Sequence, residues 1–134
     1  MTTTLITGAN KGIGYETARQ LVLASHTVWI GSRDLARGRA AAEKLGARAV
    51  QLDLTDDASV AAAAATIEAL DVLVNNAAVE ERGDGNAVIG PVDVTADLVR
   101  TTSDTNVFGT VRVLHAFLPL LQRSAAPVVV NVSS

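Results

Sequence analysis

Short apolar runs with the character of β-strands alternate along this chain with longer segments of helical character. The runs are rich in β-branched residues, whereas the segments between them place apolar residues at the spacing of a helix face. Strands linked by helices lie side by side in a parallel sheet, with right-handed crossovers and helices on both faces. The sequence therefore predicts an α/β fold with a doubly wound parallel sheet. The predicted strands are residues 3–7, 27–30, 48–52, 71–74 and 127–132.

Capping and turn-forming residues set some of the expected boundaries between these elements. Asp34 can cap a helix that runs to about Leu45, and Gly46 can end that helix. The polar, glycine-bearing stretch at 79–91 is predicted to be a loop.

Two further helices are expected in the second half of the chain. Thr55 or Asp56 can cap an alanine-rich helix that reaches about Ala69. Residues 96–123 are expected to form a long helix with a break near Ser103. That helix is apolar almost all round, so we expect it to be buried on two sides.

Composition excludes several classes of function. A net charge of −3 and a pI near 5.2 argue against binding to nucleic acid or to an anionic membrane, which require basic surfaces. The chain has no cysteine, so it has neither disulfides nor a thiolate metal site. No apolar run approaches the roughly 20 residues of a membrane span, and the first residues do not resemble a signal peptide. We therefore expect a cytoplasmic protein.

The sequence TGANKGIG, residues 7–14, lies between the first predicted strand and the first predicted helix. In that position a glycine-rich turn favours binding of a pyrophosphate, because the free N–H groups of the helix start face the anion. Gly8 permits the tight turn, Gly12 lets the backbone approach the pyrophosphate, and Gly14 lets the helix pack close to the sheet. The turn lacks the Gly-Lys-Ser/Thr of a P-loop, which argues against a nucleoside triphosphatase.

The Thr-Gly-x-x-x-Gly-x-Gly spacing of this turn resembles the hallmark of the short-chain dehydrogenase/reductase family, and TGANKGIG is most similar to its carbonyl-reductase-like members. Ala78 replaces the family's usual glycine in one of the later landmarks. The resemblance covers the whole chain and implies a Rossmann fold with strand order 3-2-1-4-5. The other landmarks, in family order, are Asp53-Leu54-Thr55, Asn75-Asn76-Ala77-Ala78, Asn106-Val107-Phe108-Gly109 and residues 130–134.

By this resemblance, residues 1–134 are expected to form one dinucleotide-binding domain, incomplete at its C-terminus after the fifth strand. The family uses an aspartate at the position of Asp53 to hold the adenine of a nicotinamide cofactor. The expected cofactor-binding residues are Gly8, Asn10, Lys11, Gly12, Ile13, Gly14, Ser32, Arg33, Asp53, Leu54, Asn76 and Ala77.

The end of the second strand predicts which nicotinamide dinucleotide is bound. An NAD enzyme places an acidic residue there against the ribose 2′-hydroxyl, whereas this chain has Ser32. Arg33 can hold a 2′-phosphate with its planar fork of donors, and Lys11 is a second cation nearby. These residues favour NADP over NAD. Asp34 could instead turn to the ribose, although its better use is as a helix cap.

The family's chemistry is hydride transfer between the nicotinamide and a small-molecule carbonyl or alcohol. A tyrosine acts as general acid and base, and a lysine four residues later lowers the pKa of that tyrosine. By resemblance, Asn106 anchors a proton-relay water and Ser134 binds the substrate oxygen. Within the 134 residues the single tyrosine is Tyr15, and neither Lys11 nor Lys44 follows it by four residues.

Three expectations follow for this chain taken alone. It should be inactive, because the tyrosine and lysine are missing. Its fifth strand should be an open, apolar edge that is prone to pairing. By analogy with family dimers, the helix at 104–123 should be a homo-oligomer contact.

Two other interpretations stay open at this point. The chain could be a stand-alone NADP-binding or interaction module without turnover. It could equally be one half of a split enzyme completed by another chain. The substrate and the direction of the redox reaction cannot be predicted from these residues.

Overall fold

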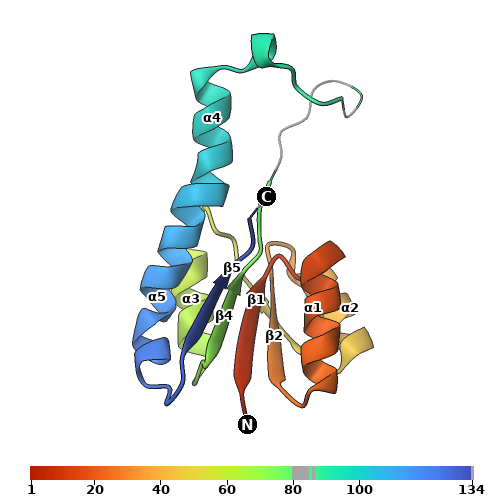
Figure 1. The fold of residues 1–134 in the computed structure, drawn as a ribbon, viewed down its shortest axis with the longest axis vertical. Helices are drawn as coiled ribbons and strands as arrows, with labels where there is room; N and C mark the ends of the chain where they lie inside the picture. Colours follow the sequence, from red (N-terminus) through yellow and green to blue (C-terminus); the bar gives the residue numbers. More distant parts are fainter. Residues whose placement is uncertain (80–84, 86, 134) are drawn as a thin grey trace.

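The computed structural model describes residues 1–79, 85 and 87–133, and shows one five-stranded sheet with helices on both faces (Figure 1). The strands are all parallel and lie in the order β3-β2-β1-β4-β5, which confirms the predicted doubly wound fold. Their bounds are β1 Thr3–Thr7, β2 Thr27–Ser32, β3 Arg48–Gln51, β4 Val72–Asn75 and β5 Val128–Asn131.

Helices α1 and α2 cover one face of the sheet, and α3 and α5 cover the other (Figure 1). Helix α4 continues beyond the carboxyl ends of the strands, in line with α5. The helical segments are α1 Gly12–Leu23, α2 Leu35–Leu45, α3 Asp57–Thr66, η2 Pro91–Asp93, α4 Ala96–Ser103, η3 Asp104–Gly109 and α5 Thr110–Gln122.

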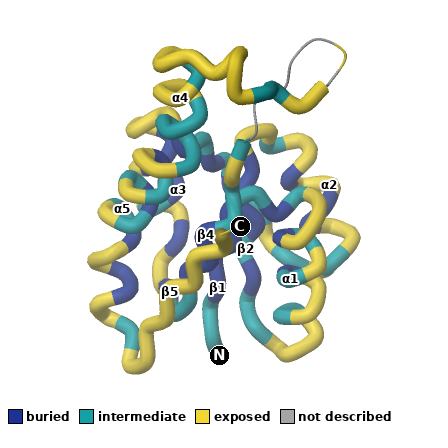
Figure 2. The backbone as a smooth tube through the Cα atoms, turned by 45° about the horizontal axis from the view of Figure 1, so that its top comes forward, coloured by how far each residue is buried: buried dark blue, intermediate teal, exposed yellow. Residues whose placement is uncertain are grey.

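Alternation along the strands creates two apolar cores, one on each face. In β1, Leu5 joins the core under α3 and α5, whereas its neighbour Ile6 joins the core under α1 and α2. Leu73 and Val74 of β4 divide in the same way, since successive strand residues face opposite sides. The central strands are therefore the most deeply buried part of the molecule (Figure 2).

The predicted caps of α2 are confirmed, whereas the end of α3 was predicted three residues too late. Asp34 accepts a hydrogen bond from the backbone N–H of Arg37 at 3.1 Å, and Gly46 ends α2 with a φ of 72°. Helix α3 ends at Thr66, because Ile67 turns to extended backbone and buries its side chain in the core. Tertiary burial thus overrides the helical preference of the alanine-rich segment.

The break expected near Ser103 is a change of helix type. Residues Asp104–Gly109 form the π-helical segment η3, which joins α4 to α5 without an intervening loop. A π segment inside a helix holds one residue more than the regular pattern, and such segments often accompany functional sites.

The long helix of η3 and α5 packs on the sheet along one side, as expected, and its other side, which by the family analogy should meet a second subunit, is apolar and exposed. Val113 and Phe117 have no exposed surface, whereas Val107, Phe108 and Val111 are more than half exposed. The buried residues pack on the sheet, and the exposed ones form an apolar stripe that faces away from it.

Strand β5 is an edge strand. It pairs with β4 in parallel register, and Val128 to Val130 are 40–48% exposed. The expectation of an open apolar edge is confirmed (Figure 2). None of the helices in the described part of the chain is long and apolar enough to cross a bilayer.

The packing of the long helix predicts unequal effects for Phe117 of α5 and Phe108 of η3. Replacing Phe117 by alanine should lower the free energy of unfolding by about 3–5 kcal/mol, because the side chain is fully buried. The matched change Phe108→Ala should cost less than about 1 kcal/mol, since Phe108 is 53% exposed. Urea unfolding of both variants measures the difference, and equal losses would contradict this packing.

Candidate functional site

A cleft of about 560 Å³ lies at the carboxyl ends of β1, β2, β3 and β4. In open parallel sheets ligands bind at this end, where the strand order reverses. Here the reversal lies between β1 and β4. Of the predicted cofactor-binding residues, Ile13 and Gly14 lie outside the lining of the cleft. Those that line it are Gly8, Asn10, Lys11, Gly12, Ser32, Arg33, Asp53, Leu54, Asn76 and Ala77.

The glycine turn fits tightly against the end of β4. A Cβ on Gly8, whose φ is +63°, would lie 2.8 Å from the Cα of Ala77. A Cβ on Gly14 would lie 2.5 Å from Nδ2 of Asn76, so the start of α1 can approach the sheet only without a side chain there. Gly14 is therefore buried under the turn, and its lack of a side chain allows the turn to take this shape.

Gly12 differs from these two glycines because it borders open space. A Cβ built on Gly12 would meet no atom within 4 Å, although its φ of +63° disfavours a side chain. The turn leads into α1, whose N-cap residue Lys11 makes no side-chain capping bond. The start of α1 thus presents uncapped backbone N–H groups beside the cleft, which suits an anion.

At the end of β2 the small polar side chain of Ser32 is buried, whereas the arginine side chains that follow it are exposed. Ser32 is 3% exposed, and its hydroxyl donates to the carbonyl oxygen of Asp34 at 2.8 Å. Arg33 and Arg37 line the cleft and are exposed. Asp34 caps α2, and one of its carboxylate oxygens lies 3.6 Å from Nε of Arg37. The alternative use of Asp34 at a ribose therefore competes with its capping bond.

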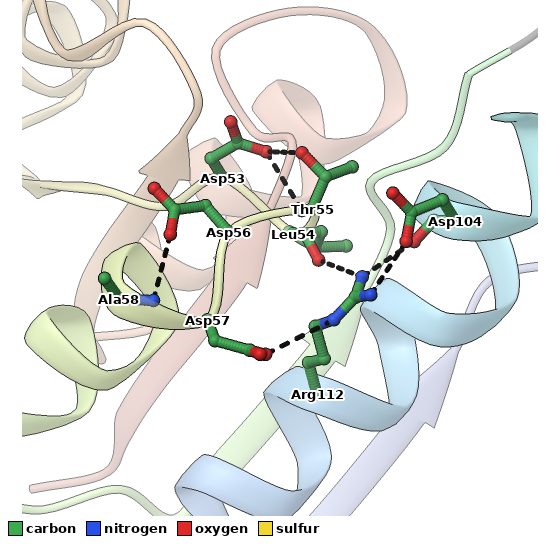
Figure 3. Close-up of polar contacts among 8 residues, drawn as sticks. All are labelled: Asp53, Leu54, Thr55, Asp56, Asp57, Ala58, Asp104 and Arg112. Carbon is green, nitrogen blue, oxygen red and sulfur yellow. Dashed lines mark hydrogen bonds and ion pairs between the residues drawn. The ribbon is translucent and has the colours of Figure 1, made fainter.

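The turn after β3 places the carboxylate of Asp53 in the lining of the cleft, where it binds Thr55 (Figure 3). Oδ1 of Asp53 accepts hydrogen bonds from the N–H and the hydroxyl of Thr55, at 3.0 and 2.7 Å. These bonds, with the positive charge of Arg33, hold the pKa of Asp53 below its ordinary value. Asp53 therefore stays negatively charged well into the acid range, and its other oxygen points away from Thr55.

Asn106, on η3, binds the chain just after β4. Its Oδ1 accepts from the N–H of Val79 and its Nδ2 donates to the carbonyl oxygen of Val79, both at 2.8 Å. These two bonds explain an asparagine in the middle of a helix. Beside them lies a second cavity of about 720 Å³ with mostly apolar walls, which include Val88, Ile89 and Leu98. Ser134, the predicted serine, and much of the predicted loop 79–91 lie outside the described residues.

Comparison with known proteins agrees with this geometry. The family model for short chain dehydrogenase matches residues 2–134. The chain belongs to the short-chain dehydrogenase/reductase family. Members bind a nicotinamide cofactor, NAD or NADP, and are oxidoreductases of small-molecule carbonyl or alcohol substrates.

Individual relatives show how much of the family's length is present. Short-chain dehydrogenase/reductase 1 of Saponaria officinalis is 38% identical over 156 residues, which cover 97% of this chain and 52% of that protein. A (+)-neomenthol dehydrogenase of Capsicum annuum is 34% identical and covers 97% and 55%. The solved menthone neomenthol reductase from Mentha piperita matches with a TM-score of 0.86 at 35% identity, covering 99% and 60%. The chain thus spans about half the length of the curated relatives it matches.

The sequence analysis did not assign roles to two residues that shape or line this dehydrogenase-type cleft. Thr7 is fully buried at the end of β1, and its hydroxyl accepts from the N–H groups of Asn76 and Ala77 at 3.0 and 2.9 Å. A threonine directly before the glycine turn was the available signal. Arg37 was missed as well, although it lies in the first turn of the helix that begins directly after Arg33 and Asp34.

Asn76 has a structural role in addition to the cofactor-binding role predicted for it. Its Nδ2 donates to the carbonyl oxygens of Thr7 and Gly8, both at 3.2 Å. The amide therefore fixes the glycine turn while the residue lines the cleft. Among the described residues no cluster of three or more His, Asp or Glu side chains could hold a metal ion.

The buried hydroxyl of Thr7 yields a testable prediction. Thr7→Val keeps the shape but leaves the N–H groups of Asn76 and Ala77 without their acceptor, which should cost about 2 kcal/mol or more of stability. Thr7→Ser keeps the hydroxyl and serves as the control, with a loss of about 1 kcal/mol for the missing methyl. Urea unfolding measures both. A valine variant as stable as the serine variant would contradict the assigned bonds.

Proposed function

We propose that residues 1–134 are the NADP-binding domain of a short-chain dehydrogenase/reductase that transfers hydride between NADPH and a carbonyl or alcohol. The cleft is the observation that carries this proposal. It joins a glycine turn, an uncapped helix start, a charged aspartate and a group of cations at one end of the sheet. Both NADP and NADH appear in complexes of solved relatives, so the preference for NADP rests on this chain's own residues.

Each part of the dinucleotide has a matching part of the cleft. The pyrophosphate lies against the glycine turn, where the open space beside Gly12 lets backbone N–H groups reach it. The adenine lies at Asp53 and Leu54, where a carboxylate held charged by Thr55 accepts from the adenine amino group. The 2′-phosphate lies beside Arg33, with Lys11 and Arg37 as further cations.

The buried position of Ser32 supports NADP over NAD. In an NAD enzyme an acidic side chain at this position would meet the ribose 2′-hydroxyl. Here the side chain is directed inward to Asp34, so no negative charge from this position opposes a phosphate. Asp34 carries a charge, but its carboxylate is held by the α2 cap and lies beside Arg37.

The chemical step is proposed for the whole protein, because the relatives are about twice as long as this chain. NADPH supplies the hydride when bound. Asn106 fixes the backbone after β4 beside the apolar cavity, where an apolar carbonyl substrate fits. Ser134 is proposed to bind the substrate oxygen. Reduction of a broad panel of ketones by the 134 residues alone would contradict the assignment of activity to the longer protein.

We further propose that the long helix at 104–123 is a homo-oligomer contact. Val107, Phe108 and Val111 form the exposed apolar stripe along it, and Leu118 continues the stripe at 42% exposure. Apolar patches of this kind on a soluble domain mark association surfaces. A second copy of the same helix is apolar in the same way and would cover them.

Cofactor titration tests the NADP assignment. NADPH should bind more tightly than NADH, because the 2′-phosphate makes charge-assisted hydrogen bonds. Arg33→Ala should weaken NADPH binding about ten- to a hundredfold, from the loss of roughly 1.5–3 kcal/mol, and should leave NADH binding nearly unchanged. Arg100→Ala, on α4 outside the cleft, is the control. Isothermal titration of the three proteins with each cofactor measures the affinities, and tighter binding of NADH than NADPH by the wild-type chain would refute the assignment.

Sedimentation velocity tests the oligomer contact. Val111→Asp should shift the chain toward the monomer, because burying an unpaired carboxylate at the interface is costly. Val92→Asp places the same change on η2, at an exposed position away from the stripe. Identical sedimentation of the wild-type chain and Val111→Asp would exclude this helix as the contact.

A further inference from the structure

Arg112 of α5 joins three separate segments through one guanidinium (Figure 3). Its Nη1 donates to the carbonyl oxygens of Leu54 and Asp104 at 2.9 and 3.1 Å. Its Nη2 lies 2.8 Å from Oδ1 of Asp104, and its Nε lies 3.3 Å from Oδ1 of Asp57. With 27% of its side chain exposed, Arg112 is shielded more than an ordinary surface arginine. One rigid, planar group therefore holds the turn after β3, the start of α3 and the start of η3.

The contacts of Arg112 differ in weight. Asp57 is 89% exposed, so solvent screens its ion pair and that contact adds little. The bonds to Leu54 and Asp104 are charge-assisted hydrogen bonds to partly buried groups, which are stronger. The connection that matters is thus between the turn after β3 and the π-helical segment.

A direct packing contact reinforces this connection. Leu54 is 5% exposed and packs closely against η3. The contact is so close that a Cβ on Gly109 would lie 2.6 Å from the Cβ of Leu54. Gly109 is the last residue of η3, and Asp104 is the first. The turn after β3 therefore touches η3 at one end by packing and at the other through Arg112.

The turn after β3 lines the cleft, whereas η3 contributes Thr105 to the cleft and Asn106 to the second, apolar cavity. Asp53, Leu54 and Thr55 line the end of the cleft where the proposed function places the adenine. Segment η3 carries Asn106, which holds the backbone of Val79 beside the apolar cavity. Among the described residues no hydrogen bond joins Asp53 or Thr55 directly to Asn106. Arg112 and the contact of Leu54 with Gly109 therefore provide the link between the two segments.

We propose that Arg112 is a positioning residue that couples occupancy of the adenine end to the fixing of Asn106. This inference rests on the proposed function, since it assumes that an adenine nucleotide occupies the turn after β3. A bound adenine restrains that turn, Arg112 and Leu54 pass the restraint to η3, and the bonds between Asn106 and Val79 open less often. Coupling of this kind is reciprocal and needs no large movement.

The test separates coupling from simple stabilisation. Adenosine 2′,5′-bisphosphate is the probe, because it carries the adenine and 2′-phosphate but no nicotinamide. Isothermal titration gives its affinity, and NMR hydrogen exchange of the Val79 amide, with and without the probe, reports on the bond to Asn106. In the wild-type chain the probe should slow this exchange several-fold.

Arg112→Gln should weaken probe binding about fivefold and abolish the effect of the probe on Val79 exchange. Arg112→Lys should fall between, since one ammonium cannot reproduce the fork that reaches Leu54 and Asp104 together. Arg100→Gln is the matched control, because Arg100 pairs with Asp97 on the exposed side of α4. It should behave as the wild type in both measurements.

The outcomes distinguish failure of the proposed function from failure of the coupling alone. If the wild-type chain does not bind the probe, the proposed function fails and this inference fails with it. If it binds, but Arg112→Gln keeps the probe's effect on Val79, the coupling alone is overturned. Should Arg112→Gln fail to fold by circular dichroism, Asp104→Asn replaces it, because it weakens the same link from the other side. An unchanged probe effect on Val79 in that variant would overturn the coupling as well.

Discussion

The junction between the ends of β1 and β4 is the constraint on which the rest of the site depends. The hydroxyl of Thr7 accepts hydrogen bonds across it from the N–H groups of Asn76 and Ala77, and the side-chain amide of Asn76 donates to the carbonyl oxygen of Thr7. Gly8 and Gly14 permit this only because neither carries a side chain. The glycine turn therefore takes its shape from the neighbouring strand as much as from its own sequence, and the cleft exists because this junction holds the two strand ends together.

Local chemistry made much of the fold predictable. The cap at Asp34, the helix end at Gly46 and the strand order follow from signals that neighbouring residues carry, or from the family's landmarks. The end of α3 was predicted too late because Ile67 leaves the helix for a place in the core, and burial of that kind depends on distant residues.

In the candidate site, too, local features could be predicted from the sequence and long-range contacts could not. The sequence predicted a set of residues that the structure brings to one cleft, because the turns after parallel strands meet at one end of the sheet. It did not predict that Thr7 and Asn76 bind each other's backbone, since their partners lie about seventy residues apart. Nor did it predict Arg112, whose partners belong to three elements. Long-range polar contacts leave almost no local trace in a sequence.

The π-helical segment has a consequence for the phase of the long helix. Successive side chains of an α-helix are rotated by about 100° about the helix axis. The extra residue held in η3 therefore offsets the side-chain directions of α4 from those of α5. Helix α5 can then bury Val113 and Phe117 on the sheet while α4 directs Leu98 toward the cavity beside Asn106. The six residues of η3 thus change the direction in which the side chains point along the helix. One continuous helix can then pack on the sheet at one end and line the cavity at the other.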